Sequence, residues 1–151
     1  LTVRMMMSHG VGTDGDLQQV KDKIAAIGKH PLRQPDPMLR IIGIKTMLDG
    51  GMLTGSAYML EPWGISDIYS IRDPRYRGVR FIEDDRLKEL VSAAVAANLQ
   101  YTAHATGDGA TTALLAAYEE VNKTQPIAAT RPCLTHSNFL DICFSVGRPL
   151  L

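Results

Sequence analysis

Three side chains that can do metal or proton chemistry stand at the carboxyl ends of three predicted strands. They are Lys45, His104 and His136. Neutral imidazoles are common ligands of transition metals. A desolvated lysine amine that has lost its proton can join them, or it can react with carbon dioxide to give a carbamate whose two oxygens bridge two cations. The alternatives are a lysine that reaches solvent from an edge strand and histidines that serve only the fold.

A regular alternation of strands and helices must position these residues. Apolar runs predict strands at 1–8, 39–48, 99–105 and 133–136, with 79–82 as a short addition. Helical spacing of apolar residues predicts helices that are capped by Asp14 or Asp16 and by Asp84 or Asp85, and a third one over 108–123. Repeated βα units predict a largely parallel sheet.

Two α/β folds fit this rhythm, an open doubly wound sheet and a (β/α)₈ TIM barrel. No Gly-x-Gly-x-x-Gly or Walker loop follows a strand, which argues against a nucleotide-binding sheet. A barrel needs about 250 residues and eight βα units. The 151 residues therefore predict a partial barrel of about four units. In a barrel the strand ends converge on one mouth, where active sites are built.

A long segment between the second strand and the second helix, residues 50–78, shows no period and carries several aromatic residues. Loops of this length inside a compact domain are usually functional or disordered, and the aromatic residues favour the ordered alternative. We expect an ordered lid or pocket wall in which Trp63 contacts substrate. Asp49, at the start of the segment, either touches substrate or serves the turn.

Other polar residues near the strand ends have plainer interpretations. Asp108 could orient a ligand, but we expect it to cap the helix that follows. Cys133 and His136 have ligand-like spacing, yet strand alternation puts them on opposite sides, so we interpret Cys133 as packing. His9 could join the mouth or belong to a loop. His30 stands among prolines and is expected to be exposed.

The length and composition describe one globular domain or a piece of one. Net charge is zero and the pI is near 7.1, which argues against nucleic acid or an acidic membrane surface as partner. The sequence contains no run of about 18 apolar residues, so no membrane span is predicted. Cys133 and Cys143 form no disulfide framework, so a reducing compartment, the cytoplasm, is expected. The chain starts with Leu, which suggests that the natural N-terminus is missing. We expect a domain over 1–139 and an irregular tail over 140–151.

Five stretches of the chain together resemble the metal-dependent amidohydrolases, in the branch of N-substituted formamide deformylase-like proteins. They are GIKTMLDGGMLTGSAYM (43–59), EPWG (61–64), DPRYRG (73–78), LQYTAHATGDG (99–109) and RPCLTHSNF (131–139). The resemblance implies a (β/α)₈ barrel that holds one or two divalent metals, with zinc expected. It implies that Lys45 is the carbamylated bridging ligand and that His104 and His136 are the next two ligands.

The implied reaction is attack of a metal-bound hydroxide on a carbonyl carbon, usually of a C–N bond in a small molecule. The family's His-x-His pair, its last-strand aspartate and its β-sandwich domain are absent, so we expect an internal fragment with three ligands at most. The rival hypothesis is a non-catalytic βα remnant that binds a small molecule or a partner chain through residues 50–78. Half a barrel leaves unpaired strand edges and an uncovered apolar interior, so we expect self-association.

Overall fold

The computed structural model describes residues 3–34 and 38–140, which form a parallel sheet with helices between its strands. The strands are β1 (Met5–Gly10), β2 (Leu39–Met47), β3 (Gln100–Ala105) and β4 (Cys133–His136). The helices are α1 (Leu17–Gly28), α2 (Asp84–Ala96) and α3 (Asp108–Asn122), with short 3₁₀ turns η1 (Pro31–Arg33) and η2 (Ala128–Thr130). The order along the chain is β1, α1, η1, β2, α2, β3, α3, η2, β4.

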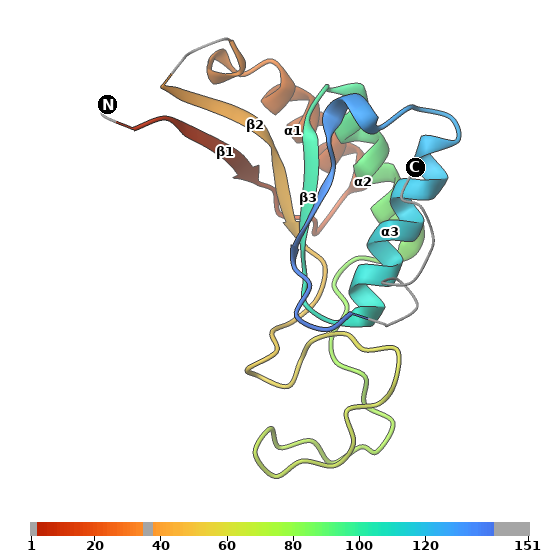
Figure 1. Ribbon diagram of the computed structural model, residues 1–151. Coiled ribbons are helices and arrows are strands. Elements are labelled where there is room, and N and C mark those ends of the chain that lie inside the picture. The colour runs from red at the N-terminus through yellow and green to blue at the C-terminus, as the bar shows by residue number, and fades with distance from the viewer. Residues whose placement is uncertain (1–2, 35–37, 141–151) are drawn as a thin grey trace.

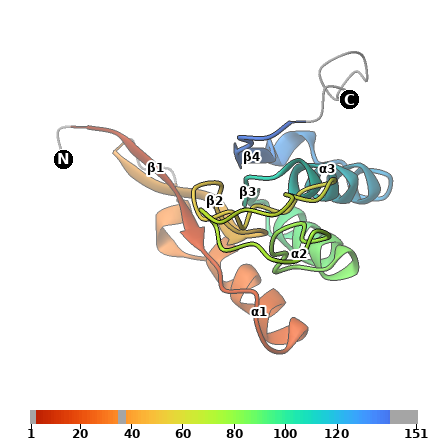
Figure 2. The same ribbon diagram turned by 90° about the horizontal axis from the view of Figure 1, so that it is seen from below.

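The strands lie side by side in the order in which they occur in the chain, β1-β2-β3-β4, and each neighbouring pair is parallel. The three α-helices lie together on one face of this sheet (Figures 1 and 2). Consecutive parallel neighbours joined by helices are the unit from which a (β/α)₈ barrel is built. The prediction of an α/β fold is confirmed: four parallel strands alternate with helices, as in part of a (β/α)₈ barrel.

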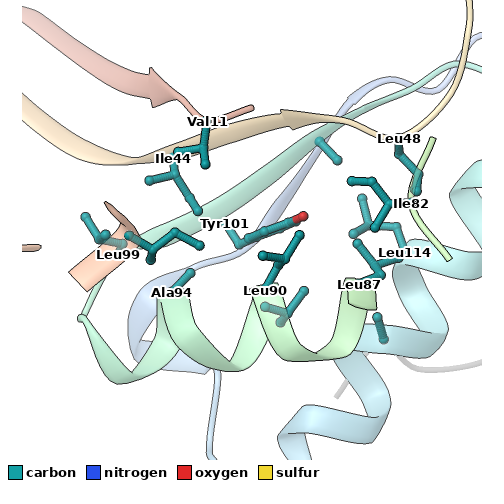
Figure 3. Close-up of a cluster of buried hydrophobic side chains, with 14 of the residues drawn as sticks. Val11, Ile44, Leu48, Ile82, Leu87, Leu90, Ala94, Leu99, Tyr101 and Leu114 are labelled. Atoms are coloured by element: carbon teal, nitrogen blue, oxygen red, sulfur yellow. The ribbon is translucent and has the colours of Figure 1, made fainter. Parts of the chain in front are cut away.

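The hydrophobic core fills the layer between the sheet and α2 and α3. Ile44 and Tyr101 enter it from β2 and β3, Leu87 and Leu90 from α2, and Leu114 from α3, all without solvent exposure (Figure 3). Burial of such side chains is the main favourable contribution to folding, about 1.5–3 kcal/mol for each large one.

A buried hydrogen bond identifies which strand residues face the helices. The Thr46 and Tyr101 hydroxyls are 2.8 Å apart inside the core. Successive strand residues point to opposite faces of the sheet. Lys45 and its register partner Thr102 therefore point to the other face, which no described helix covers.

The segment between β2 and α2, residues 48–83, leaves the sheet at the carboxyl end of β2 and returns at α2 (Figure 1). We call this segment the excursion. It contains no named helix or strand, as expected, and it is held by backbone hydrogen bonds such as Met59 N–H to the Arg77 carbonyl, 2.7 Å. The predicted strand at 79–82 is wrong, because this stretch makes only an isolated antiparallel bridge between Arg80 and Asp49.

The predicted helices are confirmed, and two of their caps are corrected. Of the two predicted caps of α1, Asp14 and Asp16, it is Asp16 that accepts from the Gln19 N–H. The N-cap of α2 is Glu83, and that of α3 is Gly107, and neither uses a side-chain hydrogen bond. The expected irregular tail falls almost wholly on 141–151, outside the described residues. Within the described ranges, no helix is both long and apolar enough to span a bilayer.

Candidate metal centre

His104 lies on β3 with its ring on the uncovered face and near the turn that follows β2. Its Nε2 is 3.2 Å from the Gly50 carbonyl oxygen and 2.8 Å from the Thr106 hydroxyl. The Gly50 carbonyl can only accept, so this contact is a hydrogen bond in the tautomer that carries the hydrogen on Nε2, and we assign that tautomer to His104. The lone pair of the neutral ring is then on Nδ1.

His136 ends β4 with an unusual backbone that brings its ring to His104. The Thr102 and Thr135 hydroxyls are 2.6 Å apart, so Thr135 faces the open side of the sheet. Regular alternation would turn His136 toward the helices. Its φ of 81° is left-handed instead, and its ring centroid lies 4.4 Å from that of His104. A non-glycine residue in this conformation is strained and is frequently found at functional sites.

Lys45 shares the open face with these rings, and charge effects link the three side chains. Partial desolvation lowers the pKa of the His136 imidazole, and the nearby charges of His104 and Lys45 lower it further, against an opposing effect of Asp49. A lowered pKa keeps an imidazole neutral and its lone pair available for a metal. The structure therefore brings Lys45, His104 and His136 to one region at the strand ends.

Asp49 serves the turns around this region. Its side chain is fully buried, and its carboxylate accepts from three backbone N–H groups: Thr106 at 2.9 Å, Gly107 at 2.8 Å and Tyr58 at 3.0 Å. Its Oδ1 also lies 3.8 Å from His104 Nε2, beyond hydrogen-bond range. Of the two interpretations offered by the sequence, this geometry favours the turn over contact with substrate.

Trp63 belongs to the excursion and holds it to the strand ends. Its indole N–H donates to the Ala57 carbonyl at 2.8 Å. Its ring makes edge contacts with Tyr69 at 5.6 Å and with Phe139, which follows β4, at 5.7 Å between centroids. This aromatic group packs the excursion against the residue that follows β4. A role of the segment as lid or pocket wall, and contact of Trp63 with substrate, stay predictions.

Three further expectations are settled by contacts. Cys133 is exposed, so the packing interpretation is wrong; alternation gives opposite sides but not which side faces the helices, and Leu134 takes that one. His9 is exposed and lies within β1, not in a loop, and its ring Nδ1 is 2.9 Å from the Gly10 carbonyl oxygen. Asp108 is the first residue of α3, and it accepts from the Leu60 N–H at 2.8 Å, which fastens the excursion.

Two contacts of the candidate site are not predictable from the sequence pattern, those of the His104 ring with the Gly50 carbonyl and with the Thr106 hydroxyl. A backbone carbonyl carries no sequence signal. Thr106 stands two residues after His104 in the stretch Thr-Gly-Asp-Gly, and a hydroxyl at that spacing was the available signal.

The donor set fits a divalent cation in kind. A metal-binding histidine usually donates its second ring N–H to a carboxylate or backbone carbonyl, and His104 does so to Gly50. Two imidazoles and a lysine give three of the four donors of a tetrahedral site. Among the described residues, no group of three or more His, Cys, Asp and Glu could hold a metal, so the set depends on Lys45.

Comparison with known proteins gives the family. The model of an amidohydrolase family matches residues 2–145. The chain belongs to this amidohydrolase family. No curated protein matches it. Two solved structures are similar, and both are of uncharacterized metal-dependent hydrolases.

The first, from Pyrococcus furiosus, is 23% identical over 81% of the chain, with a TM-score of 0.61. The second, from Pyrococcus horikoshii OT3, is 26% identical over 69% of the chain, with a TM-score of 0.54. The chain covers 23% and 20% of the lengths of these two hydrolase chains. What the similarity carries over is the fold of the sheet and its helices.

Proposed function

We propose that this amidohydrolase chain carries part of the metal site of an enzyme that hydrolyses C–N bonds of small amide-type molecules. Membership of the family supports hydrolysis, and the description of both structural neighbours as metal-dependent hydrolases supports a metal. The observation that carries the proposal is the approach of the His104 and His136 rings to 4.4 Å, achieved through a left-handed residue.

Lys45, His104 and His136 would hold the metal, and zinc suits such nitrogen donors. When bound, a divalent cation polarises a carbonyl oxygen and lowers the pKa of water. The chain's own contribution is to keep imidazole lone pairs available: the Gly50 carbonyl fixes the proton of His104 on Nε2, and a lowered pKa keeps His136 neutral. As a carbamate, Lys45 would supply two oxygens in place of one nitrogen.

Zinc binding to the purified chain is the deciding experiment. After equilibration with Zn²⁺ and removal of free metal, we expect stoichiometric zinc in the natural chain and a large loss in His104→Gln and His136→Gln. His9→Gln is the matched control, because His9 is an exposed histidine outside the cluster. Unchanged zinc in the two variants, or none in the natural chain, would reject the site and favour a non-catalytic remnant.

The reaction and the lysine are tested separately. Release of amine from N-substituted amides, with the corresponding esters in parallel, examines the proposed C–N preference. Native mass spectrometry in bicarbonate buffer examines whether Lys45 takes up carbon dioxide, with Lys45→Ala as the comparison. Metal content and hydrolysis that both survive Lys45→Ala would remove Lys45 from the proposal.

A further inference from the structure

Asp49 has a buried carboxylate and is linked to each of the two residues that contact the His104 ring, Gly50 and Thr106. It stands immediately before Gly50, whose carbonyl accepts the ring N–H of His104. It also accepts the backbone N–H of Thr106, whose hydroxyl is the second contact of the same ring nitrogen. Both residues that contact the imidazole are therefore linked to Asp49, Gly50 as its neighbour in the chain and Thr106 through its backbone N–H.

The same carboxylate fastens the excursion to the sheet. Its Oδ2 accepts from Tyr58 in the excursion and from Gly107 at the start of α3. The Tyr58 carbonyl in turn lies against Gly107 so closely that a Cβ there would come within 1.9 Å of it. A carboxylate that accepts several N–H groups in a buried place makes strong, charge-assisted hydrogen bonds.

We propose that Asp49 is the positioning residue of the metal site: through Gly50 and Thr106 it fixes the ring orientation and the proton of His104. This rests on the proposed function, since His104 is taken as a ligand. Asp49 acts without touching the metal, because its own oxygens are occupied by backbone amides and Oδ1 stays 3.8 Å from the ring nitrogen. Mutation of a residue that orients a ligating histidine usually lowers the metal affinity about 10–100-fold.

Asp49→Asn is the informative variant. It keeps the size of the side chain but replaces one acceptor oxygen with an NH₂ donor that cannot accept from a backbone N–H. Asp108→Asn is the matched control, because Asp108 is a second carboxylate that fastens the excursion, through Leu60, without contact to His104. Thr106→Val is the second variant, since it removes the hydroxyl beside His104 and leaves the Thr106 backbone N–H on Asp49.

The first readout needs no metal. Nitrogen NMR of histidine-labelled protein, at about pH 8 where an ordinary imidazole is neutral, reports which ring nitrogen of His104 carries the proton. We expect the Nε2–H form in the natural chain and in Asp108→Asn, and a mixture of both forms in Asp49→Asn and in Thr106→Val. The second readout is Zn²⁺ affinity, which should fall about 10–100-fold in Asp49→Asn and stay near the natural value in Asp108→Asn.

The outcomes separate the two hypotheses. An unchanged His104 signal in Asp49→Asn, or an equal change in Asp108→Asn, would overturn the positioning role. If Asp49→Asn does not fold, an unchanged signal in Thr106→Val would overturn it and a shifted one would support it. If the His104 signal shifts as expected but the protein binds no zinc, Asp49 still positions the His104 ring. The proposed function as a metal site would then be rejected.

Discussion

The imidazole rings of His104 and His136 lie edge to face, with centroids 4.4 Å apart and planes at 64°. Two imidazolium ions at this distance would repel each other, so the pair is compatible with one or two neutral rings. Lys45 adds a further positive charge to the same region, and it is one of the causes of the lowered pKa of His136. These charges favour the neutral form of the His136 imidazole.

Removing the charge of Lys45 should raise the pKa of His136. Desolvation is the larger cause of the lowered value and would remain, so we expect a partial return toward the ordinary value of 6.5 in Lys45→Met. Proton NMR titration of the His136 ring in the presence of a chelator measures this. Lys29→Met, at the C-cap of α1, is the control and should change nothing. A His136 pKa that is unchanged by Lys45→Met would show that the amine lies too far away to act.

Stability of the metal-free chain should depend on pH through His136. Its pKa is lowered in the folded chain, so the unfolded chain binds more protons below pH 6.5, and stability rises with pH in that window. The contribution is present above pH 6.5 and is lost as the pH falls through the folded value. Urea unfolding midpoints from about pH 5 to about pH 7.5 bracket the ordinary histidine pKa. In His136→Gln we expect a flatter profile, and identical slopes for both proteins would contradict this.

Gly107→Ala should detach the excursion from α3. A Cβ at Gly107 would lie 1.9 Å from the Tyr58 carbonyl oxygen, so the backbone of the excursion must move. Overpacking of this kind destabilises a protein by about 1–3 kcal/mol. Hydrogen exchange of the Ala110 amide, which donates to the Tyr58 carbonyl at 3.3 Å, should become faster.

The control for this substitution is Gly12→Ala, where an added Cβ meets nothing within 4 Å. It should leave both the unfolding free energy and the exchange of Ala110 near their natural values. Normal exchange of Ala110 in Gly107→Ala would mean that the excursion has another way to dock.

Tyr118→Phe should weaken the attachment of β4. The Tyr118 hydroxyl lies 3.0 Å from the carbonyl oxygens of Tyr101 on β3 and of Cys133 on β4, and its one proton is shared between them. Loss of one net hydrogen bond costs about 0.5–1.5 kcal/mol, which urea unfolding detects. Tyr76→Phe is the control, because no hydrogen bond of the Tyr76 hydroxyl occurs within the described part of the chain. Equal stability of Tyr118→Phe and the natural chain would mean that water replaces the bond.

Much of this fold follows from local patterns. Val20, Ile24 and Ile27 recur at helical spacing and are buried on α1, and the ends of β4 were predicted to the residue. The strand predicted at 79–82 is wrong because a short apolar run does not specify which strand it pairs with. In the structure Arg80 makes one isolated bridge, to Asp49. Pairing depends on distant segments, which local patterns do not contain.

The candidate site was predictable in part. The types of Lys45, His104 and His136 and their places at strand ends come from the sequence. Their approach could not be predicted, since it depends on the φ of 81° at His136, which reverses the facing expected from alternation. The sequence cannot decide whether Asp49 contacts substrate or serves the turn. Only the coordinates show that its carboxylate oxygens accept from three backbone amides.

The exposed apolar residues and the open edges of the sheet should make the isolated chain self-associate. Met5, Met6 and Met7 on β1 are 47%, 63% and 37% exposed, and Met47 at the end of β2 is 50% exposed. Within the described residues, β1 and β4 each pair on one side only. Apolar strands with free N–H and C=O groups readily pair with another chain, and a lysine on such an edge opposes this. Light scattering should therefore show a mass that rises with concentration, and Met6→Lys should reduce the rise.

Leu53→Lys provides the comparison that makes this prediction specific to the sheet. Leu53 is 81% exposed and lies in the excursion, so its replacement removes a similar apolar surface at a different place. If the open sheet drives association, Leu53→Lys should associate like the natural chain while Met6→Lys does not. Equal effects of both substitutions would mean that general apolar exposure is responsible, and a natural chain that stays monomeric at all concentrations would mean that the sheet edges are protected.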